Sequence, residues 1–202
     1  KPYLPDAPHL HFSLSHSGTW ALLACSDAHA VGVDLEALVD TGRITASLQH
    51  LSLCPNERAQ LEHLPAAQHS ARFTRWWTAK EAVMKLCGLG LQLPPTAIEI
   101  VTEDEEALRV NMACAWRRSI PAQTTLHTLN APEGYVATLA VAHSGCGVRE
   151  AGVAWHRRDD VMYSGKLIGA NRNQSTPSAQ AANSSNSSIS RRASSSVVLR
   201  AP

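Results

Sequence analysis

Two acidic residues stand two positions apart in a short apolar stretch near the start of the chain. Asp34 and Glu36 belong to segment 30–36, whose alternation of apolar and polar residues is typical of a β-strand. Side chains two residues apart on a strand point to the same face, so the two carboxylates are expected side by side. Like charges this close repel unless a cation separates them. Alone, the pair is better explained as an exposed strand end whose charges face water than as a cation site.

A second charged group lies on a predicted helix. Trp77, Glu81 and Lys85 are spaced four residues apart and share one helical face, with Lys80 at its edge. By itself this pattern also describes an ordinary surface Glu–Lys pair, which contributes only a few tenths of a kcal/mol.

Taken together, the three carboxylates and two lysines suit a hard cation that holds a phosphate ester. Mg²⁺ prefers oxygen ligands, commonly one or two carboxylates with phosphate and water. Lysines then neutralise the remaining phosphate charge. His16, in the polar segment 15–18 that we predict to be a turn, is a further candidate phosphate donor.

The elements that must position these residues follow an α+β order. We expect a β-meander first, then two helices, then four strands, without the βαβ alternation of a doubly wound sheet. The predicted segments are strands 11–14, 20–25 and 30–36, helices 55–62 and 67–86, and strands 97–101, 107–112, 124–129 and 135–142. Phe73, Trp76 and Met84 recur at helical spacing and are expected to face the core.

Composition excludes several classes of protein. The 202 residues carry a formal charge of +1, which gives no reason to expect a nucleic-acid or membrane-surface binder. The five cysteines are an odd number without a C-x-x-C pair, which argues against a disulfide framework or structural zinc and favours a reducing compartment such as the cytoplasm. No apolar run approaches 18 residues, so no membrane span is expected.

The charge is divided unevenly along the chain. Residues 1–143 hold ten Lys and Arg against fourteen Asp and Glu, whereas residues 144–202 hold eight against three. Segment 171–202 contains ten Ser and too little apolar surface to offset its ordering entropy, so we predict a disordered tail. Segment 144–170 is interpreted as a linker of uncertain structure.

Several motifs occur in an order that resembles a known family. The stretches are G-V-D-L-E at 32–36, W-T-A-K-E-A-V-M-K at 77–85 with G-L-G at 88–90, F-S-L-S-H-S-G at 12–18, K-P at 1–2 and G-Y-V-A at 134–137. They resemble motifs of the 4′-phosphopantetheinyl transferase superfamily, closest to its surfactin-synthetase-activating type, over residues 1–143. Ser13 replaces the usual Asn of that family, which we expect to loosen the predicted turn.

The resemblance implies a fold and a quaternary arrangement. In that type, two similar α/β halves form a pseudo-dimer with coenzyme A and Mg²⁺ in the cleft between them. This chain then corresponds mainly to the C-terminal half, an antiparallel sheet packed with helices, with most of the N-terminal half absent. A complete protein of this type is expected to be a monomer with an internal pseudo-dimer.

The resemblance also implies an activity. Family members transfer the 4′-phosphopantetheine group of coenzyme A to a serine of an acyl or peptidyl carrier protein and release adenosine 3′,5′-bisphosphate, in a Mg²⁺-dependent reaction. The main alternative is a fragment that binds a carrier protein or coenzyme A without turnover. A Mg²⁺-dependent nuclease or phosphatase is disfavoured by the acidic balance of residues 1–143.

The resemblance assigns roles to individual residues. The implied Mg²⁺ ligands are Asp34, Glu36 and Glu81, and Glu81 is also the candidate base for the serine proton. The implied contacts with coenzyme A are Lys80 and Lys85 on the pyrophosphate, Ser15 and His16 on the phosphates, and Lys1 near the adenine. Glu57 stands where several members carry an additional acid that assists the site.

Overall fold

The computed structural model describes residues 1, 3–102, 107–121, 123–142, 151–157 and 196–199. The strands are β1 His11–Ser17, β2 Trp20–Ser26, β3 Val31–Ala37, β4 Ile98–Thr102, β5 Ala107–Met112, β6 Thr124–Leu129, β7 Tyr135–Ala142, β8 Ala151–Arg157 and β9 Ser196–Leu199. The α-helices are α1 Ala46–Ser52, α2 Pro55–His63 and α3 Ala66–Cys87. Short 3₁₀ turns lie at Thr41–Arg43, Gly90–Gln92, Pro95–Ala97 and Cys114–Ser119.

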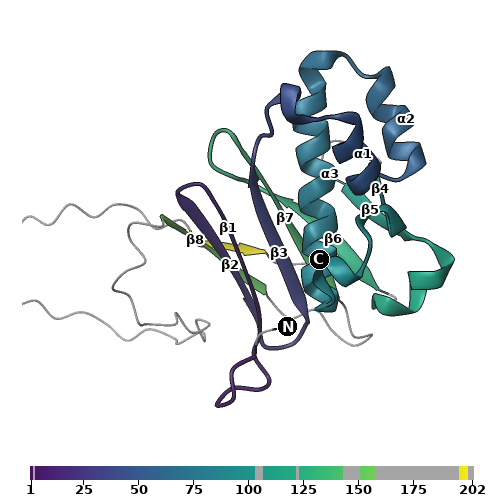
Figure 1. Cartoon of the computed structure of the whole chain (residues 1–202). Coiled ribbons are helices and arrows are strands. Elements are labelled where there is room, and N and C mark those ends of the chain that lie inside the picture. The colour runs from purple at the N-terminus through teal and green to yellow at the C-terminus, as the bar shows by residue number, and fades with distance from the viewer. Residues whose placement is uncertain (2, 103–106, 122, 143–150, 158–195, 200–202) are drawn as a thin grey trace, which may run out of the picture.

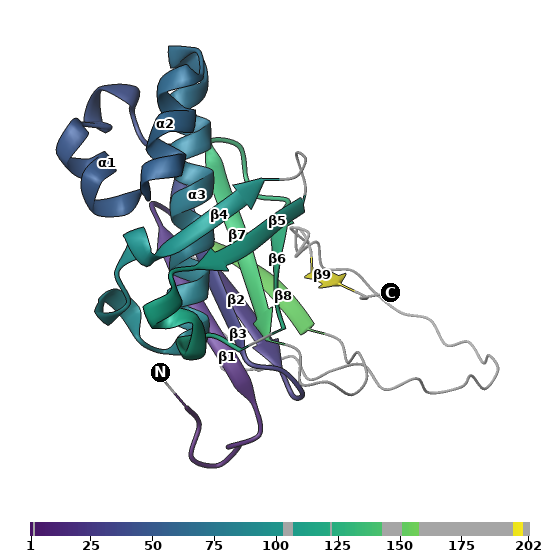
Figure 2. The same cartoon turned by 90° about the vertical axis from the view of Figure 1, so that its right-hand side faces the viewer.

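The strands form two antiparallel sheets. One has the order β1-β2-β8-β9 and the other the order β3-β7-β6-β5-β4. Helix α3 lies along β3 and β7 of the second sheet, and α1 and α2 lie beside α3 (Figure 1; Figure 2). The predicted α+β class, with an antiparallel sheet packed against helices, is confirmed.

Strand β3 is covered on both faces, which explains its nearly unbroken burial. Val31, Val33 and Leu35 are fully buried in a cluster that includes Leu22 and Ala24 of β2. The alternate residues of β3 face α3. A strand enclosed in this way positions its polar side chains firmly, because neither face can shift without disturbing a packed core.

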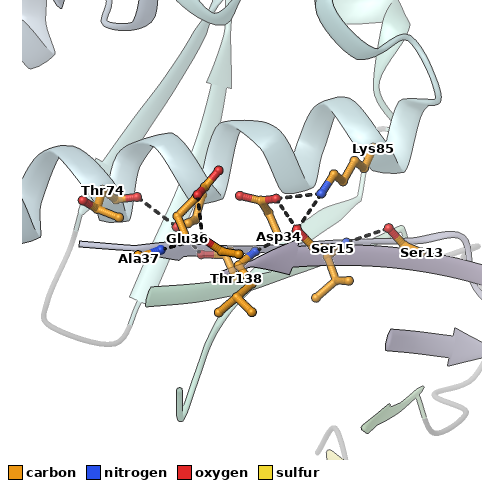
Figure 3. A network of polar contacts seen from close by, with 12 residues as sticks. Ser13, Ser15, Asp34, Glu36, Ala37, Thr74, Lys85 and Thr138 are labelled. Atoms are coloured by element: carbon orange, nitrogen blue, oxygen red, sulfur yellow. Dashed lines mark hydrogen bonds and ion pairs between the residues drawn. The ribbon is translucent and has the colours of Figure 1, made fainter. Parts of the chain in front are cut away.

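The predicted β-meander is correct for its first hairpin and wrong for its third strand. β1 pairs with β2, but β3 takes its ladder partner from β7, which is about a hundred residues further along the chain. β1 instead runs beside the free edge of β3, where serine hydroxyls of β1 accept backbone N–H groups of β3 (Figure 3). The pairs are Ser13 with Val33 at 3.0 Å, Ser15 with Leu35 at 3.2 Å and Ser17 with Ala37 at 3.0 Å.

The predicted helices and the other strands are confirmed within one or two residues. α3 ends where predicted, at Gly88, whose φ of 73° lies in the left-handed region and whose N–H bonds to the carbonyl oxygens of Met84 and Lys85. Phe73, Trp76 and Met84 face the core, as expected.

Helix α1 was not predicted, since its seven residues are too few to show a clear period. Its start is set by Thr45, whose side chain accepts the N–H of Leu48. Within the described residues, no helix combines the length and the apolar character needed to cross a membrane.

The C-terminal predictions need a partial correction. β8 falls in the segment interpreted as a linker, and β9 falls in the tail predicted to be disordered. β8 pairs with the edge of β2 and β9 pairs with β8. Ladder partners supply backbone hydrogen bonds that composition does not reveal. The rest of these predictions, on 143–150, 158–195 and 200–202, lies outside the described residues.

Helix α3 rests directly on the backbone of β3 at Gly32. A Cβ atom added at Gly32 would lie 2.1 Å from the carbonyl oxygen of Ala82 and 2.4 Å from the amide nitrogen of Leu86. Both contacts are with helix backbone, which cannot move aside without displacing α3. Only glycine permits this approach, and the approach brings the polar residues of β3 under the face of α3 that carries Glu81 and Lys85.

We therefore expect Gly32→Ala to force α3 away from β3. The destabilisation should reach about 3 kcal/mol, the upper part of the range for overpacking, because backbone atoms are the obstacle. Urea unfolding followed by circular dichroism measures this value. Gly42→Ala is the matched control, since its Cβ would meet nothing nearer than Asp40 Oδ1 at 3.6 Å. Equal stability of the two variants would contradict the close packing.

Candidate functional site

The site forms where β3 passes beneath α3. Asp34 and Glu36 lie side by side on the face of β3 that points toward α3 (Figure 3). Asp34 is 2% exposed, whereas Glu36 and Glu81 are half-buried. Glu81 interacts electrostatically with Asp34, Glu36 and Lys85. The structure therefore brings together the three carboxylates and one of the two lysines that the sequence predicted.

Ser15, Asp34 and Lys85 form a connected hydrogen-bond network (Figure 3). Lys85 Nζ lies 2.6 Å from Asp34 Oδ1 and 2.9 Å from Ser15 Oγ, and Ser15 Oγ donates to the same Oδ1 at 2.7 Å. Ser15 Oγ also accepts the N–H of Leu35. Its one donor and both acceptor positions are thus in use, so Ser15 holds strand, carboxylate and lysine in one arrangement.

The two half-buried carboxyls resist ionisation. Burial raises the pKa of Glu36 above its ordinary value and the charge of Asp34 adds to the rise, while hydrogen bonds from Ser17 and Trp77 oppose it. Burial also raises the pKa of Glu81, with Asp34 and then Glu36 as the neighbouring negative charges and Lys85 opposing. One ammonium group does not compensate three carboxylates, so the cluster favours additional positive charge.

The oxygen donors of these three carboxylates fit the chemistry of a hard divalent cation. Asp34 Oδ2 is buried and has no hydrogen-bond partner among the residues that the structure describes, which is rare for a carboxylate oxygen. Oxygen donors from three carboxylates match the chemistry of Mg²⁺. In the described part of the chain, however, no three acidic, His or Cys side chains converge in a metal-binding arrangement. Lys85 lies on Asp34 instead.

Lys80 does not belong to this site, contrary to the prediction. Its side chain is 0% exposed and its Nζ donates to Glu57 Oε2 at 2.6 Å, Ser52 O at 2.8 Å and Pro95 O at 3.0 Å. All three N–H donors are therefore used inside the protein, and no donor remains for a pyrophosphate. The predicted role of Lys80 was wrong because Lys80 lies on the core face of α3, whereas Glu81 and Lys85 lie on the face toward β3.

Glu57 is likewise structural rather than an acid that assists the site. It is 0% exposed, and besides Lys80 it accepts the backbone N–H groups of Cys54 at 2.9 Å and Ile100 at 2.8 Å. Burial lowers the pKa of Lys80, and the carboxylate of Glu57 opposes that effect. The pair ties α2, α3 and β4 together at the far side of α3 from the carboxylates.

The N-terminal motif residues are divided between two faces. The predicted turn at 15–18 is wrong, because β1 continues to Ser17 and the reversal follows at Gly18. Alternation on the strand turns Ser15 inward, whereas His16 is exposed and takes no part in the network of Ser15. Ser13 is also part of strand β1, and its hydroxyl accepts the backbone N–H of Val33. Ser13 therefore does not loosen a turn, contrary to the prediction from the sequence.

Lys1 contacts the backbone rather than the carboxylates. Its Nζ donates to the carbonyl oxygens of Val31 at 2.7 Å and Leu86 at 3.3 Å, at the start of β3 and near the end of α3. Burial lowers the pKa of this ammonium group. Its predicted place near an adenine stays a prediction.

Two residues of the site were not singled out from the sequence as contacts of Glu36. Ser17 Oγ donates to Glu36 Oε2 at 3.2 Å, and Trp77 also donates a hydrogen bond to this carboxylate. The signal for Ser17 was present: serines at 13, 15 and 17 alternate and must share one face of a strand.

The buried pair gives a stability prediction. Lys80→Met leaves the carboxylate of Glu57 without its cation in the core, so we expect a loss of about 3–5 kcal/mol in unfolding free energy. Adding Glu57→Gln removes the uncompensated charge and should recover at least about 1 kcal/mol. Urea denaturation of the two variants measures both values. A double variant that is less stable than Lys80→Met alone would contradict this account.

The raised pKa of Glu81 gives a pH-dependent prediction. A carboxyl whose pKa is higher in the folded chain stabilises the fold most below its unfolded pKa of about 4.3, and that stability is lost as pH rises through the folded pKa. We expect Glu81→Gln to raise the Tm at pH 7 in EDTA by roughly 2 °C, with the gain disappearing near about pH 4.

The control for this prediction is Glu62→Gln on the exposed side of α2, whose Tm should match that of the unmodified chain at both pH values. A lower Tm for Glu81→Gln at pH 7 would show that the ionised carboxyl stabilises the metal-free fold and would contradict the prediction.

Comparison with known proteins finds relatives that share one family name. The chain is 29% identical over 143 residues to a 4′-phosphopantetheinyl transferase of Bacillus subtilis, an alignment that covers 71% of this chain and 60% of the relative. It is 34% identical over 148 residues to the 4′-phosphopantetheinyl transferase HetI of Nostoc sp., covering 72% of this chain and 58% of the relative. The chain therefore spans about three fifths of the length of these curated relatives.

A shorter alignment joins the chain to the 4′-phosphopantetheinyl transferase Sfp of Bacillus subtilis, with 33% identity over 94 residues, 46% of this chain and 40% of the relative. Among solved structures, the holo-[acyl-carrier-protein] synthase of Neisseria meningitidis aligns with a TM-score of 0.46 and 20% identity, covering 57% of this chain and 98% of that one. The family description "4'-phosphopantetheinyl transferase superfamily" matches residues 30–140, which include β3, α3 and most of β7. The chain belongs to the 4′-phosphopantetheinyl transferase superfamily.

Proposed function

We propose that this chain carries the C-terminal catalytic elements of a Mg²⁺-dependent 4′-phosphopantetheinyl transferase. The reaction moves the phosphopantetheine group of coenzyme A to a serine of an acyl or peptidyl carrier protein and releases adenosine 3′,5′-bisphosphate. One observation carries the proposal: Asp34, which is ion-paired with Lys85, and Glu36 on β3 both interact electrostatically with Glu81 on α3, inside the region matched by the family.

The proposed metal ligands are the carboxylates of Asp34, Glu36 and Glu81. A bound Mg²⁺ would neutralise charge on the pyrophosphate of coenzyme A during its cleavage. The unpartnered Oδ2 of Asp34 and the raised pKa values of Glu36 and Glu81 support this role, because each indicates negative charge that the protein leaves without full compensation.

The remaining steps rest on the chain's own side chains. Lys85, whose side chain is 29% exposed, can donate to a phosphate oxygen. The serine oxygen of the carrier attacks the phosphorus that bears pantetheine, and the bond from that phosphorus to the bridging oxygen breaks. Glu81, whose raised pKa makes its carboxylate a stronger base, accepts the serine proton. Placement of these groups supplies most of the acceleration.

Coenzyme A and the carrier protein are the proposed partners. The matched relatives are named as 4′-phosphopantetheinyl transferases, but this chain spans only part of their length. Binding of coenzyme A or a carrier protein without turnover is therefore the alternative outcome of the test.

Free thiols at Cys25, Cys54 and Cys87 support a reducing compartment such as the cytoplasm.

The test is the intact mass of an apo carrier protein after incubation with coenzyme A, Mg²⁺ and this chain. We expect a mass gain of one phosphopantetheine group that EDTA abolishes. Glu81→Ala should reduce the rate at least about 100-fold through loss of the base and a metal ligand. Glu62→Ala, which removes an exposed carboxylate on α2, should leave the rate unchanged.

The outcomes separate the alternatives. Coenzyme A binding that Mg²⁺ does not alter, without any mass gain, would favour the non-catalytic binder. Release of inorganic phosphate from simple phosphate esters would favour a phosphatase. Equal loss of activity in Glu81→Ala and Glu62→Ala would remove the special role of Glu81.

A further inference from the structure

Lys85 places a positive charge directly on a carboxylate that the proposed function assigns to the metal. Its Nζ is 2.6 Å from Asp34 Oδ1, and the same oxygen accepts the hydroxyl of Ser15. Oδ1 is therefore committed to protein donors. Oδ2 of the same carboxylate is buried and finds no hydrogen-bond partner in the described part of the chain.

This division makes Lys85 a competitor of a bound cation. The two oxygens of one carboxylate are separated by a single carbon atom, so an ammonium on Oδ1 and a divalent ion on Oδ2 are close neighbours. Like charges at such a separation repel, and the repulsion is strong where protein excludes water. Asp34, 2% exposed and held by Ser15, cannot relieve it by turning away.

Lys85, unlike Asp34, has a side chain that is exposed enough to move to a different hydrogen-bond partner. Its side chain is 29% exposed, and its described contacts use two of its three N–H donors, on Asp34 and Ser15. Lys80 provides the contrast on the same helix: it is 0% exposed and all three of its donors are held by the protein. Lys85 can therefore exchange Asp34 and Ser15 for a ligand, whereas Lys80 stays bound to its three partners inside the protein.

We propose that Lys85 is a built-in counter-cation of Asp34, which opposes metal binding at the three carboxylates until a phosphate-bearing substrate accepts its N–H groups. The inference rests on the proposed function and adds to it that metal and substrate bind cooperatively, with Lys85 as the origin of the coupling. By linkage, whatever factor the substrate adds to metal affinity, the metal adds to substrate affinity.

The test is a titration with Mn²⁺, a paramagnetic substitute for Mg²⁺, followed by electron paramagnetic resonance with and without coenzyme A. We expect the unmodified chain to bind Mn²⁺ weakly alone and more tightly with coenzyme A. Lys85→Gln should bind Mn²⁺ about tenfold more tightly without coenzyme A, and coenzyme A should then improve the affinity by a smaller factor. Circular dichroism checks that the variant is folded, and Lys85→Met, which keeps the apolar stem, replaces it otherwise.

Two controls separate a local effect from general charge. Lys85→Arg keeps a cation at the same place and should bind Mn²⁺ no more tightly than the unmodified chain. Arg118→Gln removes an exposed charge at the 3₁₀ turn Cys114–Ser119 and should leave Mn²⁺ affinity unchanged. If Lys85→Gln binds Mn²⁺ no more tightly than the unmodified chain, or if Lys85→Arg gains as much, the inference is overturned.

The result is independent of the transfer assay. Phosphopantetheine transfer together with an unchanged Mn²⁺ affinity in Lys85→Gln overturns the counter-cation alone. Tighter Mn²⁺ binding by Lys85→Gln in a chain that transfers nothing supports the counter-cation and removes the proposed function. Absence of Mn²⁺ binding in every variant, with coenzyme A present, overturns the counter-cation.

Discussion

The close approach of α3 to β3 at Gly32 is the constraint on which the rest of the structure depends. A helix normally rests on a sheet through side chains, but here helix backbone lies where a Cβ of residue 32 would be. The approach brings Asp34 within 2.6 Å of Lys85 and places Glu81 in the field of both strand carboxylates. A wider separation would leave two unrelated charged surfaces, so the packing of one glycine decides whether the site exists.

The same helix uses its two faces for opposite purposes. Lys80 points into the core and joins α3 to α2 and β4 through Glu57, an arrangement that leaves no donor unpaired. Glu81, the next residue in the chain, faces the carboxylates of β3 and is left with an uncompensated charge. The Lys80 side of the helix therefore carries a fully paired charge that stabilises the fold. The Glu81 side carries carboxylates whose charge is not fully compensated. Buried charge that is fully paired anchors the helix, and partly buried charge that is not paired is available for a cation and a phosphate.

Strand β1 contributes to both tasks through three alternating serines. Their hydroxyls take the place of the backbone carbonyls that a ladder partner would offer along the edge of β3. Ser15 and Ser17 then extend to the carboxylates of Asp34 and Glu36 as well. The edge of β3 is thereby satisfied without a second ladder strand, and the carboxylates are oriented by the same atoms.

The sequence by itself determined most of the local elements and which charged side chains share a strand or helix face. Alternation placed Asp34 and Glu36 on one face, helical spacing placed Glu81 with Lys85, and glycine ended α3 at Gly88, because these are short-range consequences of strand and helix geometry. Tertiary structure alone decided that β3 pairs with β7 rather than β2, that Lys80 lies in the core, and that His16 points away from Ser15. Strand pairing depends on contacts between distant segments, and the two faces of a helix acquire different roles only when a core and a sheet are packed against them.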